Sequence, residues 1–204
     1  MLRKKNEGKT MKFVAPKIVL TSLLLLQGCA SAPPTQFYSL EAIATPIAAQ
    51  SLEKKPLVGI TQISLPSALE RKQIVTRDEK GQLTIAEQHQ WAALLKQNMT
   101  EVLATDLAAK QPNYWFKAHP WSLLGRVDYR IVIDVTRLDI VLGKSIRFVV
   151  NWTVLNEKNH TVLQHDSLEL TQPLADEKYE TAVLGLNALL ASLSEKLAFV
   201  QFEK

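Results

Sequence analysis

Residues 129–170 read YRIVIDVTRLDIVLGKSIRFVVNWTVLNEKNHTVLQHDSLEL, and the alternation within them decides the fold. In residues 129–135 and 145–155 every second side chain is apolar, and the second run is centred near Trp152. Alternation of this kind predicts strands with one buried face, and residues 161–170 are predicted to form a third strand. The turns between the runs are short, so the three predicted strands form an antiparallel meander.

Two other stretches have helical periodicity. Apolar side chains recur at spacings of three and four in residues 91–110, and a second stripe runs through residues 176–199. Shorter strand-like runs occupy residues 37–40, 57–65, 73–77, 82–87 and 114–118, with a hairpin signal at Asp78-Glu79-Lys80-Gly81. Together these elements predict an α+β fold, an antiparallel sheet of about six strands with two long amphipathic helices packed on one face.

The N-terminal segment is typical of a secretion signal. Lys12 and Lys17 precede an apolar run, residues 18–26, which at about 1.5 Å per residue cannot cross a hydrocarbon core about 30 Å thick. That length fits the apolar region of a signal peptide. The run ends in Leu26-Gln27-Gly28-Cys29, which resembles the bacterial lipobox and holds the single cysteine of the chain.

The resemblance to a lipobox implies that residues 1–28 are a lipoprotein signal peptide, with Met11 as a second candidate start. It also implies that Cys29 receives diacylglycerol and, after cleavage, an N-acyl chain such as palmitate, which would hold the protein on a membrane almost permanently. The alternatives are a short signal anchor and a secreted protein with an incidental cysteine. The pair Ala30-Ser31, with no Asp after the cysteine, favours the outer over the inner membrane.

The positive charge of the chain belongs to this signal. Six of the 24 Lys and Arg residues and one of the 20 acidic residues precede Cys29, which leaves 18 basic and 19 acidic side chains after it. A mature protein so close to neutral has no broad attraction for phosphate backbones, so nucleic acid is excluded as a partner.

The mature chain divides at about residue 56. Residues 29–56 are predicted to hold the lipidated Cys29, an extended tether with Pro33-Pro34, and a linker with one short strand. Residues 57–204 are predicted to be a globular domain.

The sequence contains no recognisable motif for catalysis or metal binding. A single cysteine excludes a cysteine metal cluster, and no HExxH, GxSxG, GxGxxG or Walker motif occurs. His160 and His165 could approach each other, but surface histidines are the favoured interpretation. Asp128 and Asp134 oppose the apolar face of their strand, which indicates a solvated face and not a catalytic pair. We therefore expect no enzyme, no metal and no cofactor apart from the covalent lipid.

Two features resemble contact surfaces. Ile140, Val141 and Leu142 lie near a predicted hairpin tip, where they either fold back into the core or form an apolar patch that touches a partner. The strand around Trp152 has apolar residues on both faces, so it is either covered on both sides or meets another subunit on one.

Three segments resemble the ABC-type transport auxiliary lipoproteins of the PqiC type, a membrane integrity-associated transporter subunit. Phe37-Tyr38-Ser39-Leu40 is similar to the Tyr-Tyr-x-Leu that opens their mature domain. Residues 65–77, LPSALERKQIVTR, resemble their Pro-x-x-Leu-(Asp/Glu)-Arg-x-x-(Ile/Val)-Val-x-Arg stretch. Trp91 resembles the Trp that opens their first helix, although Ala93 stands where a Pro is frequent.

The resemblance implies a non-enzymatic subunit of an intermembrane lipid transport system in a Gram-negative bacterium. It implies a lipoprotein in the outer membrane that faces the periplasm, docks onto a periplasmic MCE-domain protein and forms homo-oligomers, including rings. The alternative function is a lipoprotein that itself carries a lipid or another small apolar ligand between sheet and helices. A hydrolase is disfavoured because no nucleophile and base pattern is present.

Overall fold

The computed structural model describes residues 33–43, 55–121 and 125–202. The chain divides into two units, Met1–Pro34 and Thr35–Lys204, and every helix and strand given below belongs to the second. The predicted signal peptide, the candidate start Met11 and the lipidation site Cys29 lie outside the described residues.

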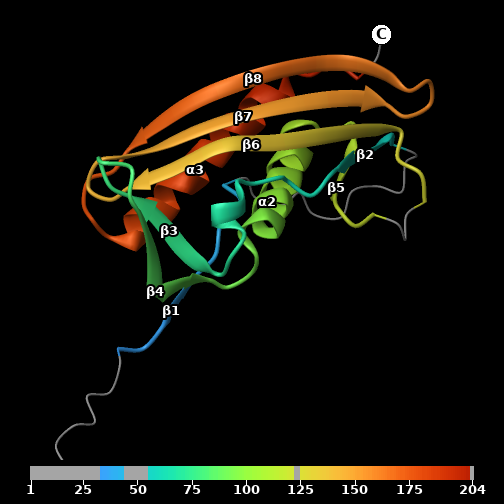
Figure 1. Ribbon diagram of the computed structural model, residues 1–204. Helices are drawn as coiled ribbons and strands as arrows, with labels where there is room; N and C mark the ends of the chain where they lie inside the picture. Colours follow the sequence, from blue (N-terminus) through green and yellow to red (C-terminus); the bar gives the residue numbers. More distant parts are fainter. Residues whose placement is uncertain (1–32, 44–54, 122–124, 203–204) are drawn as a thin grey trace, which may run out of the picture. The chain divides into compact units, whose positions relative to one another are not determined.

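The predicted meander is confirmed. Strands β6 (Tyr129–Val141), β7 (Ser145–Asn156) and β8 (Thr161–Pro173) pair antiparallel, with Ile133 opposite Trp152 and Phe148 opposite Leu170 (Figure 1). Alternate residues of β7 are buried, namely Ile146, Phe148, Val150, Trp152 and Val154. The opposite face of β7 is half-buried from Val149 to Leu155, so Trp152 belongs to a strand that is fully covered on one face only.

Two further strands make this sheet mixed. Strand β2 (Leu57–Ile60) pairs in parallel with β6 on one side and with β5 (Trp115–Ala118) on the other, giving the order β5-β2-β6-β7-β8. Parallel neighbours need a long crossover connection, and the chain between β2 and β5 supplies one that contains a helix. The expectation of a purely antiparallel sheet was therefore wrong.

A second, smaller sheet holds β1 (Gln36–Tyr38), β4 (Leu83–Trp91) and β3 (Gln73–Arg77), in the order β1-β4-β3. The predicted hairpin between β3 and β4 is confirmed, because the two strands pair antiparallel. The third strand, β1, runs parallel to β4. The described residues thus contain eight strands in two mixed sheets of three and five, instead of about six in one sheet. Strand β1 ties the predicted linker to the same unit as the rest of the domain.

The two predicted helices are present and cover the same face of the larger sheet (Figure 1). Helix α2 (Leu95–Lys110) begins four residues later than expected, because Trp91 ends β4 and its N–H donates to the Lys72 carbonyl over 2.6 Å. Helix α3 (Tyr179–Ala198) packs beside it. Among the described residues, no helix combines the length and apolarity needed to span a bilayer.

The layer between helices and sheet is filled with side chains. Met99, Leu103 and Leu186 from the helices and Phe148 from the sheet are fully buried in one continuous core. Phe202 closes one end of this core, with its ring 4.7 Å from that of Tyr114 and 5.0 Å from that of Tyr129.

Candidate interaction surfaces

The segment that most resembles the family stretch, residues 65–77, folds into the short 3-10 helix η2 (Ser67–Leu69) and β3. Leu69, Ile74 and Val75 are buried, and the Arg71 Nε donates to the Ala68 carbonyl over 3.0 Å. Packing and local hydrogen bonds therefore explain most of the motif.

The last residue of the segment joins the two sheets. The Arg77 Nε donates to Asp139 Oδ1 over 2.7 Å, and the Arg137 Nε lies 3.6 Å from Asp139 Oδ2. One carboxylate of β6 thus serves two guanidinium groups, which fixes β3 beside the last residues of β6. A notch of about 180 Å³ opens between these strands, with Leu69, Val75 and Leu138 among its apolar walls.

The residues proposed to contact a partner lie at the tip between β6 and β7. Ile140 is buried, with 4% of its surface exposed, whereas Val141 and Leu142 are half-buried and Leu142 packs against the core. The burial fits the interpretation that this segment folds inward, and contact with a partner stays a prediction for all three. Beside the tip, Lys144 forms an ion pair with Glu79 and lowers the pKa of that carboxyl by its hydrogen bond.

Tyr38 is the centre of a hydrogen-bonded cluster at β1. Its Oη lies 2.6 Å from Gln36 Oε1, 3.1 Å from Glu180 Oε1 and 2.8 Å from His89 Nδ1. Because a phenol has one proton, Tyr38 can donate to only one of these three groups at a time. Burial, with the neighbouring Glu180 carboxylate as a second cause, raises the pKa of Tyr38 to about 12.

Further contacts fasten the chain after β1 to both helices. The Leu40 N–H donates to Asn98 Oδ1 of α2 over 2.7 Å, and the Glu41 N–H donates to Asn187 Oδ1 of α3 over 3.2 Å. The His89 ring stacks on Tyr179, the first residue of α3, with 3.9 Å between centroids. The segment that follows the predicted tether is therefore held by β4, α2 and α3, a set of contacts that the sequence did not indicate.

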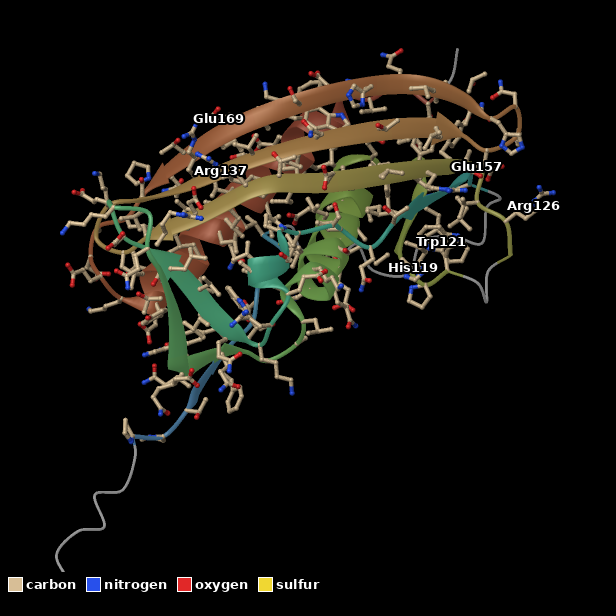
Figure 2. All side chains as sticks on the ribbon, viewed as in Figure 1. His119, Trp121, Arg126, Arg137, Glu157 and Glu169 are labelled. Carbon is tan, nitrogen blue, oxygen red and sulfur yellow. The ribbon has the colours of Figure 1, made fainter. Side chains whose placement is uncertain are left out.

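A different surface lies at the other end of β6, on the side of the sheet away from the helices. Gly59 of β2 is opposite Arg130, and a Cβ placed on it would lie 3.0 Å from two ring atoms of Trp121 and 2.9 Å from Val127. Trp121 thus covers the glycine. Figure 2 shows His119, Trp121 and Arg126 near this end of the sheet, with Arg137 and Glu169 toward the opposite end.

Trp115 and Lys117 of β5 lie on the same face, because they are opposite Leu57 and Gly59 in the parallel register. Trp115 is 45% exposed, and the Lys117 Nζ lies 5.4 Å from the centroid of its ring. No sequence pattern had indicated Trp115 and Trp121 as part of a contact surface. Two Trp residues within seven positions around His119-Pro120 were the available signal.

The polar residues considered for chemistry have structural partners. Asp128 Oδ2 accepts the Leu57 N–H over 2.9 Å, and Asp134 accepts a hydrogen bond from Ser64 Oγ, so both carboxylates attach the segment of β2 to β6. His165 Nδ1 lies 2.9 Å from Thr153 Oγ1. In the part of the chain that the structure describes, no three His, Cys, Asp or Glu side chains gather into a possible metal site.

The family model of the ABC-type transport auxiliary lipoprotein component matches residues 38–198. No curated protein matches the sequence. Two solved structures share the fold: an uncharacterized protein (17% identity, TM-score 0.67, covering 81% of this chain and 97% of that one) and protein XCC0632 of Xanthomonas campestris, of the family DUF330 (16% identity, TM-score 0.60, covering 79% of this chain and 92% of that one). At these identities the likeness concerns the fold alone.

Proposed function

Because this chain belongs to the family of ABC-type transport auxiliary lipoprotein components, we propose that it is a non-enzymatic subunit of an MCE-type intermembrane lipid transport system, anchored in the outer membrane and facing the periplasm. The family match over residues 38–198 carries this proposal. It covers the first of the three resembling segments from Tyr38 and the other two in full, so the predicted family is confirmed, while the transport system and the membrane are our proposal.

The way the chain holds its N-terminal side supports an anchored adaptor. Gln36 of β1 is seven positions after Cys29, and a chain spans at most about 3.5 Å per position, or about 25 Å in all. A lipid on Cys29 would therefore keep β1 within about 25 Å of the membrane surface. The Tyr38 cluster and the Asn98 and Asn187 contacts would transmit that attachment to the folded unit.

A role as a carrier of lipid receives less support. The space between helices and sheet, where a carried lipid was expected, is occupied by core side chains such as Met99, Phe148 and Leu186. A lipid there would have to displace side chains packed at the density of a protein interior. We therefore retain the adaptor as the proposed function, with self-association, including rings, as part of the proposal.

The anchor is tested with Cys29→Ser. Without the thiol no diacylglycerol can be attached, so we expect the variant to leave the outer-membrane fraction in which the wild type is recovered, and to keep its signal peptide. Fractionation of cells on a density gradient and the intact mass of each protein give both readouts. Ser31→Ala is the matched control and should behave as wild type. Wild type without acyl mass would contradict the anchor.

The partner is tested with purified lipidated protein in nanodiscs and the periplasmic part of the MCE protein of the same cell. We expect saturable binding, and a mass above that of a monomer after mild extraction. A co-purified lipid in equal molar amount, with no affinity for the MCE protein, would instead support the carrier.

A further inference from the structure

We propose that the surface formed by Trp115, Lys117, Trp121 and Arg126, called here the Trp121 surface, is the docking face for an acidic protein surface with an apolar centre. The inference rests on the proposed function, since it names the face by which the lipoprotein would meet its transport partner. Trp115, Lys117 and Trp121 lie on the Gly59 face of the larger sheet, and Arg126 lies at the same end of the sheet, as Figure 2 shows for Trp121 and Arg126.

The Trp121 surface is remote from the tether. Gly59, which Trp121 covers, is opposite Arg130 of β6, whereas the smaller sheet that contains β1 is attached to β6 at Asp139. Asp139 is nine positions after Arg130 along the strand, which at about 3.3 Å for each position is about 30 Å. An anchor that holds β1 near one membrane therefore leaves the Trp121 surface free for a molecule in the periplasm.

Charge indicates what kind of molecule fits. Nearby charges are neutralised in pairs, since Arg130 Nη2 lies 2.7 Å from Glu157 Oε2 and Lys158 Nζ lies 3.3 Å from Asp128 Oδ1. Lys117 and Arg126 form no ion pair with any residue that the structure describes. The surface thus has an excess of positive charge beside two tryptophans, and Trp and Arg are the residues that dominate binding energy in protein interfaces.

The orientation of Trp121 favours a protein over a lipid surface. The two ring atoms nearest to the Gly59 position, Cδ2 and Cε2, are equidistant from it at 3.0 Å, so the bond shared by the two rings lies directly over the glycine. The ring therefore lies against the sheet instead of projecting from it. A flat, fixed aromatic face suits packing against another protein, whereas insertion into a membrane interface needs side chains that project.

The test uses the full lipidated protein in nanodiscs and the periplasmic part of the MCE protein as the probe. The double variant Lys117→Glu/Arg126→Glu is expected to bind about 10-fold more weakly, and Trp115→Ala about 30-fold more weakly, as for a central interface residue. Wild-type binding should also weaken as the salt concentration rises. All three substituted residues are at least partly exposed, so the variants should keep the thermal midpoint of the wild type.

Matched controls lie on the smaller sheet. Lys72→Glu/Lys80→Glu makes the same change of charge, and Phe37→Ala removes an aromatic ring that is 64% exposed, more than Trp115. These variants should bind within about 2-fold of wild type. If the controls lose affinity and the Trp121-surface variants do not, docking lies elsewhere and the inference is wrong although the proposed function survives.

Two other outcomes are informative. If the wild type does not bind the probe at all, the proposed function fails and the inference falls with it. If the lipidated protein in nanodiscs binds vesicles of phosphatidylglycerol, and the Trp121-surface variants lose that binding while they still bind the MCE protein, the surface is a lipid contact and the inference is overturned.

Discussion

At the Asp139 end of β6 the basic side chains have acidic partners, whereas at the Arg130 end two basic side chains have none among the residues that the structure describes. Arg77 and Arg137 share the Asp139 carboxylate, and Lys144 pairs with Glu79, so those contacts join the two sheets. At the other end Lys117, which lies over the Trp115 ring, and Arg126 have no acidic partner among the described residues. The difference separates side chains that hold the fold together from side chains available to another molecule.

The largest loss of stability is expected from Gly59→Val, at the Arg130 end of β6. A Cβ there would lie 2.9 Å from Val127 and 3.0 Å from the Trp121 ring, so the ring must move. We expect the free energy of unfolding to fall by about 2–3 kcal/mol. Urea unfolding followed by tryptophan fluorescence measures it, and Val132→Thr on the neighbouring strand is the control. A variant as stable as wild type would show that Trp121 is not fixed over the glycine.

A smaller loss is expected from Asp139→Ala at the opposite end. The carboxylate is only 19% exposed and serves two guanidinium groups, so its removal leaves Arg77 without its ion pair. We expect the free energy of unfolding to fall by about 1–2 kcal/mol. Glu87→Ala, on exposed β4, should stay within about 0.5 kcal/mol. Equal losses in the two variants would mean that the pairing does not join the sheets.

Tyr38→Phe tests the cluster on the smaller sheet. The folded pKa of about 12 exceeds the ordinary value of about 10, so the fold favours the protonated phenol. Its contribution is complete below pH 10 and is lost as the pH rises to 12. Since the phenol is partly open to solvent, we expect about 1 kcal/mol. Urea midpoints from pH 8 to pH 12 should fall less in the variant; parallel curves would exclude Tyr38 as the titrating group.

The smallest effect is expected from Glu79→Gln. Although Lys144 lowers the pKa of Glu79, the two side chains are 70% and 61% exposed, and an exposed ion pair contributes little. The thermal midpoint should not change measurably. A clear decrease would mean that even the exposed contacts at this end contribute to joining the sheets.

Local patterns explain what the sequence could predict. The alternation in β6 and β7 and the short turns between them are properties of neighbouring residues, so the meander and the hairpin of β3 and β4 were predictable. In β2 all four residues are buried, and a short buried run contains no information about the direction of its neighbours. Trp91 was predicted to open the helix but ends β4. A single apolar residue at the boundary fits the periodicity of a helix and that of a strand equally well.

The contact surfaces depend on residues far apart in the chain. Tyr38 meets His89 and Glu180 across 51 and 142 positions, and Arg77 meets Asp139 across 62. No local spacing in the sequence predicts contacts between residues so far apart. The position of Trp121 over Gly59 was equally unpredictable. Glycine is required at position 59 only because Trp121, 62 positions later in the chain, lies against it.

Strand β8 limits how anchored copies could crowd together. It forms one border of the larger sheet for thirteen residues, and such a border can pair with the border of a neighbour. Asp166 is opposite Trp152 and lies on the same face of the sheet, but at the border it is exposed. A second strand laid along β8 would strip water from this carboxylate, which is costly. If the proposed lipid confined the protein to two dimensions, copies would collide often, and the Asp166 charge would disfavour continuous pairing along β8.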